Sequence, residues 1–145
     1  MRIAIASDHA AIDLKATLAD WLREQGHDVN DLGPATTDRV DYPDYGYKLA
    51  EAIASGAADY GVVLCGSGIG ISIAVNRNPK CRAALVTEPL SAALAREHND
   101  ANVIAMGARL TGPDMAIACL SAFLVTPFGG GRHAGRVDKL SNPPS

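Results

Sequence analysis

The chain has 145 residues, 48% of them hydrophobic and 20% charged, which is enough for one domain with a buried core. Thirteen basic residues against sixteen acidic ones give a net charge of −3, and this balance excludes a general attraction to nucleic acid. No apolar run approaches the roughly 20 residues of a membrane-spanning helix, so we expect no membrane partner.

The N-terminal run Met1 to Ala6 is followed by Asp8 and His9, too early for the apolar region of a signal peptide. We therefore predict a strand there. The three cysteines are odd in number and widely spaced, and they include no C-x-x-C pair of the kind that binds metals. Free thiols in a reducing, cytoplasmic compartment are the expectation.

Short β-branched runs alternate with helical stretches along the chain, a pattern typical of a parallel sheet covered by helices on both faces. The third strand is the most uniformly apolar and is predicted to be central. Ligands of such doubly wound sheets bind outside the carboxyl ends of the strands, so we expect the site at that edge. The predicted strands are 2–6, 27–32, 60–65, 82–86 and 103–106.

Helices are predicted between these strands from apolar spacing and from the positions of proline and glycine. The first ends near Gly26, and later ones run over about 43–55, as far as Asn76, and over 89–97. A further helix begins at Pro113. The apolar stripes are Leu14, Leu18, Trp21 and Leu22 in the first helix, and Ile117, Leu120, Ser121 and Leu124 in the one after Pro113.

A glycine loop follows directly on the third strand, with the sequence Gly66-Ser67-Gly68-Ile69-Gly70. Glycines let backbone N–H groups turn toward a ligand, and the start of the next helix adds partial positive charge. The loop is therefore a candidate anion site. It is not a nucleotide loop, since Ile71 and Ser72 follow without a lysine, and it lacks the dinucleotide fingerprint. The plain alternative is a tight strand-to-helix turn.

Cys65 ends the third strand beside this loop. A thiol at such a position has its thiolate favoured by nearby N–H groups and can act as a base or a nucleophile. The alternative is a small buried hydrophobe, which is what we expect of Cys81 and Cys119. The adjacency of Cys65 to the glycine loop favours the chemical role.

Two polar pairs add further candidates. Asp8 and His9 follow the first strand, where Asp8 is also suited to cap a helix. His98 and Asn99 lie near the end of the fourth helix, which should carry them away from the carboxyl edge of the sheet. They then serve the site of a neighbouring subunit or lie in a loop that folds back. A surface histidine that favours the helix dipole is the alternative for His98.

A break rich in glycine at 126–131 precedes a short basic segment, which we predict to be helical at about 132–141. Arg132 and Arg136 are four residues apart, on one face of such a helix, and suit the grip of a phosphate. A solvated basic tail is the alternative. With this segment, the chain is interpreted as a single domain over 1–145.

Taken together, these motifs resemble type B ribose-5-phosphate isomerase and its relatives, from residue 2 to about residue 140. The resemblance implies an α/β fold, a flavodoxin/Rossmann-like three-layer αβα sandwich with a five-stranded parallel sheet. It also implies a homodimer or homotetramer with sites shared between two subunits. The matching stretches are Ser7-Asp8-His9-Ala10, Asp41-Tyr42-Pro43, Cys65 to Ala74, Arg96-Glu97-His98-Asn99-Asp100 and Gly131-Arg132-His133 with Arg136.

The resemblance also implies roles for single residues. Cys65 would move a proton between C2 and C1 of an open-chain phosphosugar, and His98 would assist ring opening. No cofactor or metal is expected, because a thiolate can carry the proton alone and no cluster has metal-ligand spacing. The residues that would hold the substrate are Asp8, His9, Tyr42, Gly66, Ser67, Gly68, Ile69, Gly70, Asn99, Arg109, Arg132 and Arg136.

Two positions depart from the family pattern, and a third bears on the choice of base. Ala11 stands where relatives commonly have glycine and would reshape the pocket floor slightly, while Ser67 replaces a frequent threonine but keeps the hydroxyl. Some relatives use a carboxylate base at the position of Val75, and the absence of a carboxylate there favours Cys65.

The predicted reaction interconverts ribose 5-phosphate and ribulose 5-phosphate. The first alternative is the same chemistry on allose 6-phosphate, galactose 6-phosphate or a four-carbon sugar phosphate. Galactose 6-phosphate is disfavoured because relatives that use it work as two unlike subunits, whereas this chain carries Cys65, His98 and both arginines. The second alternative is a non-catalytic flavodoxin-like module that holds a phosphorylated ligand or FMN, and the scarcity of aromatic residues disfavours a flavin.

Overall fold

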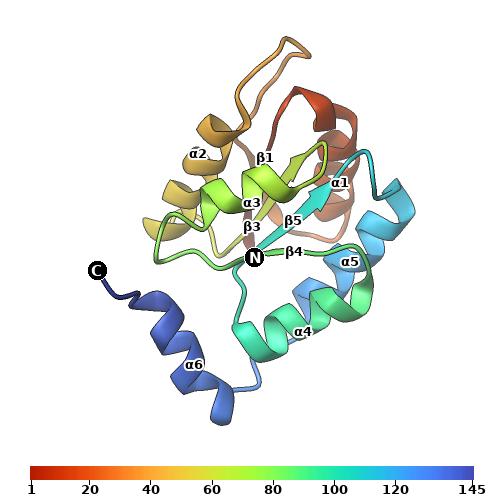
Figure 1. The fold of residues 1–145 in the computed structure, drawn as a ribbon. Coiled ribbons are helices and arrows are strands. Elements are labelled where there is room, and N and C mark those ends of the chain that lie inside the picture. The colour runs from red at the N-terminus through yellow and green to blue at the C-terminus, as the bar shows by residue number, and fades with distance from the viewer.

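In the computed structural model, which describes all residues 1–145, five strands form one parallel sheet (Figure 1). Each pair of neighbouring strands is parallel, and the apolar run 60–65 lies at the centre, as predicted. The strand order is β2-β1-β3-β5-β4, with bounds Asp28–Asp31, Arg2–Ser7, Tyr60–Cys65, Val103–Gly107 and Ala83–Leu85. The predicted α/β class and five-stranded parallel sheet are confirmed.

The helices that cover the sheet begin close to the predicted positions, and prolines stand in the first turn of three of them. None has the combination of length and apolarity that crossing a membrane requires. Their bounds are η1 His9–Ala11 (a short 3₁₀ turn), α1 Ile12–Glu24, α2 Tyr42–Ala54, α3 Ile69–Val75, α4 Pro89–Asn99, α5 Pro113–Val125 and α6 Arg132–Ser141.

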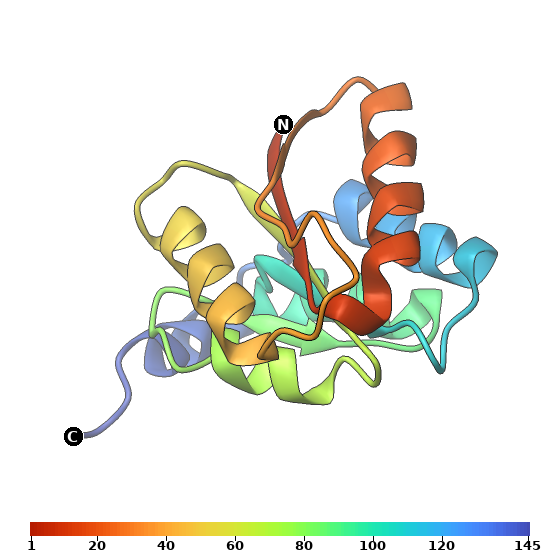
Figure 2. The ribbon, with the colours of Figure 1, turned by 90° about the horizontal axis from the view of Figure 1, so that it is seen from above.

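Each face of the sheet has its own core, because side chains alternate along a strand. Ile3 and Ile5 of β1 pack with α1, α4 and α5, whereas Ala4 and Ala6 pack with α2 on the other face. Figure 2 shows β1 between α1 on one side and α2 on the other. This arrangement is the predicted three-layer sandwich. It explains why the inner strands are apolar without interruption.

The position of β5 brings a distant segment to the end of β3. The flavodoxin order is 2-1-3-4-5, whereas here β5 lies between β3 and β4 and pairs Gly107 with Cys65. Two hydrogen bonds continue the pairing, from Ala108 N to Cys65 O at 2.9 Å and from Arg109 N to Gly66 O at 3.0 Å. Arg109 is thereby carried to the glycine loop.

The helix α4 runs two residues further than predicted and includes His98 and Asn99. It ends there because Asp100 adopts the left-handed conformation, with φ 46° and ψ 42°, that commonly closes a helix. Arg96 holds Asp100 in place through a contact of 2.8 Å between Nη1 and Oδ1. His98 and Asn99 are therefore residues of a helix end, and neither lies in a loop that folds back.

The predicted apolar stripe of α5 is rotated relative to the face that the structure buries. Ser121, Ile117 and Leu124 of the predicted stripe are only partly buried, whereas Leu120 is fully buried. The small side chain of Ala116 and the thiol of Cys119 permit close packing against the sheet, so they face the core in place of larger residues. The buried residues of α5 are Ala116, Cys119, Leu120 and Phe123.

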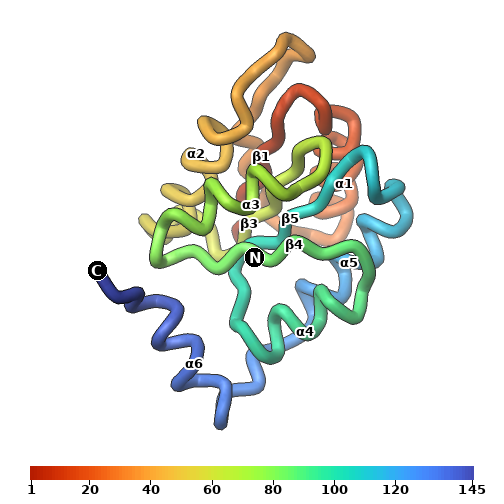
Figure 3. Tube along the Cα trace, in the orientation of Figure 1, coloured from red at the N-terminus to blue at the C-terminus, as the bar shows by residue number.

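The C-terminal helix α6 lies apart from the sandwich, beyond α4, as the ribbon and the chain trace both show (Figures 1 and 3). The predicted basic helical segment is confirmed in its bounds. Val137 is its buried residue, and its far end receives a hydrogen bond from Arg82 Nη1 to Ser141 Oγ at 3.4 Å. Most of this helix therefore presents its side chains to solvent.

Candidate active site

Cys65 lies at the carboxyl end of the central strand, as expected of a residue at the ligand-binding edge. Its side chain is only 5% exposed, and the backbone N–H of Gly68 donates a hydrogen bond to Sγ at 3.1 Å. The N–H comes from the turn before α3, which has only seven residues. The direct donor to the sulfur is thus a loop amide, and the dipole of a short helix adds little to it.

Gly68 can present its amide to the sulfur because its backbone adopts a conformation that other residues avoid. Its φ is +78°, and a Cβ at this position would come within 2.6 Å of the carbonyl carbon of Met106. Both the left-handed conformation and the contact with β5 therefore require glycine. Ser67 supports the turn, since its Oγ accepts a hydrogen bond from Ile69 N at 3.2 Å.

Two side chains from other parts of the chain pack against the glycine loop. The guanidinium of Arg109 lies against Gly66, where a Cβ would be 3.3 Å from Nε. The ring of Tyr42, at the start of α2, lies so close to Gly70 that a Cβ there would be 2.5 Å from the ring. Glycine at both positions makes room for these side chains. A positive charge and a phenol therefore stand beside the loop.

The first strand adds Asp8 and His9 to the same edge. Asp8 is buried and caps the turn η1, since its Oδ1 accepts a hydrogen bond from Ala10 N at 2.9 Å. His9 Nδ1 accepts a hydrogen bond from Val40 N at 3.1 Å, which leaves Nε2 as the ring nitrogen that can donate to a ligand. The capping alternative for Asp8 is thus correct, and it coexists with a place in the cleft.

These residues line one cleft with a volume of about 570 Å³. Sequence analysis named most of them, but it missed Ala10, Ile73 and Leu110. The last two are apolar and more than half exposed, at 58% and 68%, and this unusual exposure is visible only in the structure. The predicted residues in the lining are Asp8, His9, Tyr42, Cys65, Gly66, Ser67, Ile69, Gly70 and Arg109.

Gly68 stands beside Cys65 in the loop without lining the cleft, whereas His98, Arg132 and Arg136 form a second group outside that lining. His98 ends α4 and stacks on His133 of α6, with ring centroids 4.5 Å apart and planes at 17°. Arg132 and Arg136 lie exposed on the first turns of α6. Because α4 leads back to the start of β5, this group lies at the amino edge of the sheet. The expectation that α4 carries His98 away from Cys65 is correct.

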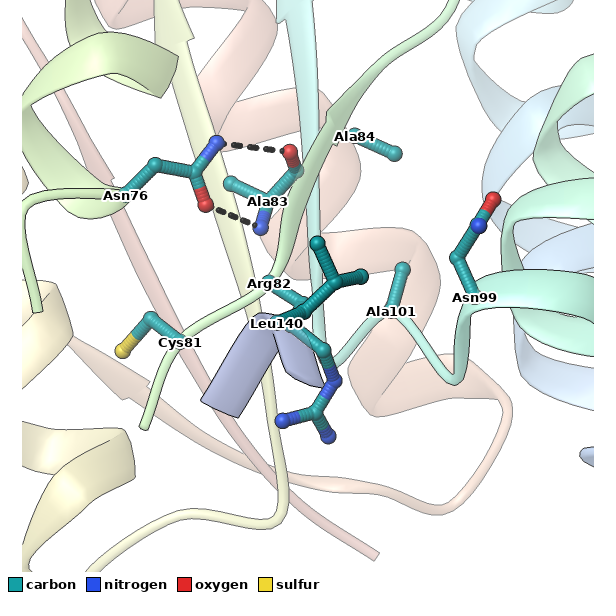
Figure 4. A pocket seen from close by; sticks show the side chains of 8 residues that line it. All are labelled: Asn76, Cys81, Arg82, Ala83, Ala84, Asn99, Ala101 and Leu140. Carbon is teal, nitrogen blue, oxygen red and sulfur yellow. Dashed lines mark hydrogen bonds between the residues drawn. The ribbon is translucent and has the colours of Figure 1, made fainter. Parts of the chain in front are cut away.

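Asn99 lines a different cavity, of about 330 Å³, between β4, the end of α4 and α6 (Figure 4). The Asn76 side chain clamps the edge strand there, donating to Ala83 O at 2.9 Å and accepting from Ala83 N at 2.7 Å. Cys81 also lines this cavity, and burial raises the pKa of its thiol to about 11. Burial likewise raises the pKa of Cys119. Both thiols therefore stay protonated, as expected of small buried hydrophobes.

The sequence profile of the Ribose/Galactose Isomerase family matches residues 3–140 of this chain. The chain belongs to the Ribose/Galactose Isomerase family. It is 41% identical to ribose-5-phosphate isomerase B of Escherichia coli over 140 residues, covering 97% of this chain and 94% of the relative. It is 43% identical to D-erythrulose-4-phosphate isomerase of Pectobacterium atrosepticum over 141 residues, covering 97% and 93%.

Solved structures of family members have the same fold. Ribose-5-phosphate isomerase B of Clostridium thermocellum superposes with a TM-score of 0.96 at 48% identity, covering 97% of this chain and 95% of that one. The Thermotoga maritima protein gives 0.96 at 46% identity, with 98% of each chain covered. The resemblance found in the motifs is thereby confirmed. The chain is an isomerase of the type B ribose-5-phosphate isomerase kind, and the alternative of a non-catalytic module is not supported.

Within this isomerase fold, the structure divides the predicted site residues between two edges of the sheet. Cys65, the glycine loop and Arg109 stand at the carboxyl edge, where the cleft offers a sulfur, loop amides and a positive charge. His98 and the α6 arginines stand at the amino edge. No three histidine, cysteine or carboxylate side chains gather closely enough to hold a metal ion. The groups of the isolated cleft are therefore suited to proton transfer beside the glycine loop.

Proposed function

We propose that this isomerase interconverts ribose 5-phosphate and ribulose 5-phosphate through an enediolate, with Cys65 as the base. The observation that carries the proposal is the 3.1 Å hydrogen bond from Gly68 N to Cys65 Sγ, at a buried strand end that opens into the cleft. An N–H donor there stabilises negative charge on sulfur. The 41% identity to the Escherichia coli ribose-5-phosphate isomerase supports the choice of substrate.

The chemistry follows from these groups. The Cys65 thiolate takes the proton from C2 of the open-chain aldose, which gives a thiol and an enediolate. The thiol, whose proton exchanges with solvent, donates a proton to C1 while a hydroxyl proton passes from O2 to O1, so the ketose forms with no net gain or loss of protons. Amides of the 66–70 loop are candidates to stabilise the oxyanion during this transfer. The proposed base, Cys65, and the candidate N–H donors for the oxyanion are therefore adjacent in the chain.

We further propose that His98, Asn99, Arg132 and Arg136 act in the cleft of a second subunit. Within one chain these residues stand at the opposite edge of the sheet from Cys65, so they can serve the reaction only across an interface. The exposed apolar side chains of Ile73 and Leu110 at the cleft support this, since large apolar residues gathered at a surface commonly mark a contact with another chain. His98 would assist ring opening, and the arginines would grip the phosphate.

A four-carbon sugar phosphate is the second candidate substrate. The relative named D-erythrulose-4-phosphate isomerase is 43% identical to this chain, as similar as the ribose-5-phosphate isomerase. The cleft residues near Cys65 act on C1 and C2, which the four-carbon and five-carbon substrates share. The two substrates differ in the distance from C2 to the phosphate. The discrimination between them therefore depends on the position of the α6 arginines, which we propose as the partners of the phosphate.

The test is an isomerase assay over a panel of aldose phosphates with four, five and six carbons, run in deuterium oxide. We expect the highest kcat/KM for ribose 5-phosphate, with deuterium entering at the carbon that Cys65 reprotonates. A higher kcat/KM for the four-carbon phosphate would replace the substrate but keep the mechanism. Turnover with no deuterium in the product, at any extent of reaction, would speak for hydride transfer and against a proton-moving base.

A further inference from the structure

His133 lies between the two arginines of α6, and the proposed function gives it no role. Its ring stacks on that of His98, with centroids 4.5 Å apart and planes at 17°. The two rings come from different elements, since His98 is in the last turn of α4 and His133 in the first turn of α6. Both side chains are half-buried. The stack is therefore a tertiary contact.

Backbone hydrogen bonds fix the segment between α5 and α6 next to the stacked rings. Gly129 N donates a hydrogen bond to Glu97 O at 2.9 Å, and His133 N donates one to Gly130 O at 3.0 Å. A Cβ on Gly129 would lie 3.1 Å from Glu97 O, so a larger residue would crowd the contact. These hydrogen bonds thus fix the backbone on both sides of the stacked rings, independently of the ring contact itself.

The charges around His133 disfavour its protonation. Burial, followed by the positive charges of His98, Arg132 and Arg136, lowers the pKa of His133 below its ordinary value, and Glu97 opposes them weakly. These are the titratable groups that face it from α4 and from α6. Arg96 of α4 is paired with Asp100, the residue that follows the helix. At neutral pH His133 is therefore a neutral ring, which stacks on His98 without charge repulsion.

We infer that His133 is a positioning residue for His98: it fixes the plane of the His98 ring and restricts the stacked pair to a single proton. The inference rests on the proposed role of His98 in ring opening. That step breaks the bond between C1 and the ring oxygen, takes a proton from the C1 hydroxyl and gives one to the ring oxygen. A histidine suits it when its ring is held in one orientation and it exchanges one proton. Two protons on the pair would place like charges face to face.

Two variants separate stacking from protonation. His133→Phe keeps an aromatic ring on His98 but cannot take a proton, whereas His133→Ala removes both properties and is compatible with a helix. His27→Ala is the control, because His27 lies at the N-terminus of β2 and contacts the chain terminus through its Nδ1. The readout is an NMR titration of the histidine rings in the intact, ligand-free protein, which does not depend on activity.

In the wild type and in His27→Ala, we expect the His98 ring resonance to shift as His133 takes up its proton at low pH. In His133→Phe this shift should vanish. A wild-type His98 resonance that does not respond to protonation of His133, or the same low-pH shift in His133→Phe, would overturn the inference. Coupled titration in a protein that isomerises no sugar phosphate would support the coupling and refute the proposed function.

Kinetics with ribose 5-phosphate supply the second arm. His133→Ala should lower kcat by about tenfold or more, because a misplaced ring costs the proton transfer. His133→Phe should keep most of kcat and lose the acid limb of the pH profile that belongs to His133. If His133→Ala instead raises KM with kcat unchanged, His133 binds the phosphate uniformly and does not position His98.

Discussion

Replacement of Cys65 by alanine tests the proposed base most directly. A positioned general base contributes about 10²–10⁴-fold to the rate, which corresponds to about 3–5 kcal/mol of activation free energy. We expect Cys65→Ala to lose at least this factor in kcat. Binding of ribitol 5-phosphate, which has no carbonyl and cannot isomerise, should change little, because the proposed phosphate and hydroxyl partners remain.

The stability cost of this change is small enough to keep the fold. Removing one buried sulfur costs about 1 kcal/mol, and losing the acceptor for Gly68 N costs about another 1 kcal/mol. The total is well below the stability of about 5–15 kcal/mol that is usual for a domain. Cys65→Ser is the companion variant, since its hydroxyl can still accept from Gly68 N but is a far weaker acid than a thiol.

The matched control is Cys81→Ala, because Cys81 and Cys65 are both 5% exposed. Urea unfolding should show similar small losses in both alanine variants, while only the Cys65 variant loses turnover in the isomerase assay. Turnover by Cys65→Ala or Cys65→Ser within a few-fold of the wild type would refute the assignment of the base. A loss of turnover in Cys81→Ala equal to that in Cys65→Ala would point to a general packing effect.

Three further outcomes test the rest of the site. In initial-rate assays, Arg132→Ala should raise KM about tenfold and leave kcat nearly constant, because it removes one charge-assisted hydrogen bond of about 1.5 kcal/mol. An unchanged KM would show that Arg132 does not bind the phosphate. When the inactive variants Cys65→Ala and His98→Asn are mixed in equal amounts and refolded together, about a quarter of the wild-type activity should return. The reason is that half of the dimers then contain both variants, and each of these dimers has one intact shared site of its two. No recovery of activity in the refolded mixture would mean that each site lies within one chain. Gly68→Ala should lower the free energy of unfolding in urea by more than about 3 kcal/mol, because of its positive φ and the clash with β5. The control Gly56→Ala, at φ +79° with open space around it, should lower it by about 1 kcal/mol. Equal losses in the two variants would show that the clash at Gly68 relaxes freely.

The strands and the Cys65 cleft could be predicted because their causes are local. An uninterrupted apolar run over 60–65 marks an inner strand, and the parallel sheet rule then places its end, with Cys65 and the loop, at the ligand edge. The first-strand pair Asp8 and His9 joins them for the same reason. Only the family resemblance supplied Arg109, because the exchange of β4 and β5 that brings it to Gly66 leaves no local signal in the sequence.

Other features could not be predicted because they depend on packing between elements. The spacing of α5 is apolar on several faces, so the choice of Ala116 and Cys119 over Ser121 for the core is made by the shape of the sheet. The residues Ile73 and Leu110 look like ordinary core positions in the sequence. Their exposure at the cleft depends on where α3 and the segment after β5 end, which only the assembled fold determines.

The separation of the two groups of site residues follows from the direction of α4. A helix between parallel strands runs against them, so its last turn lies at the edge opposite to the ligands. The 11 residues of α4 span about 16 Å at 1.5 Å per residue, whereas a proton-transfer group must come within about 3 Å of its target. Shortening α4 to move His98 toward the other edge would detach the helix from the core that Ala92 and Ala95 help to form. The proposed roles of Cys65 and His98 in one reaction therefore favour a site shared between two chains. In a two-fold symmetric dimer each chain then completes the cleft of the other, and two equal sites result.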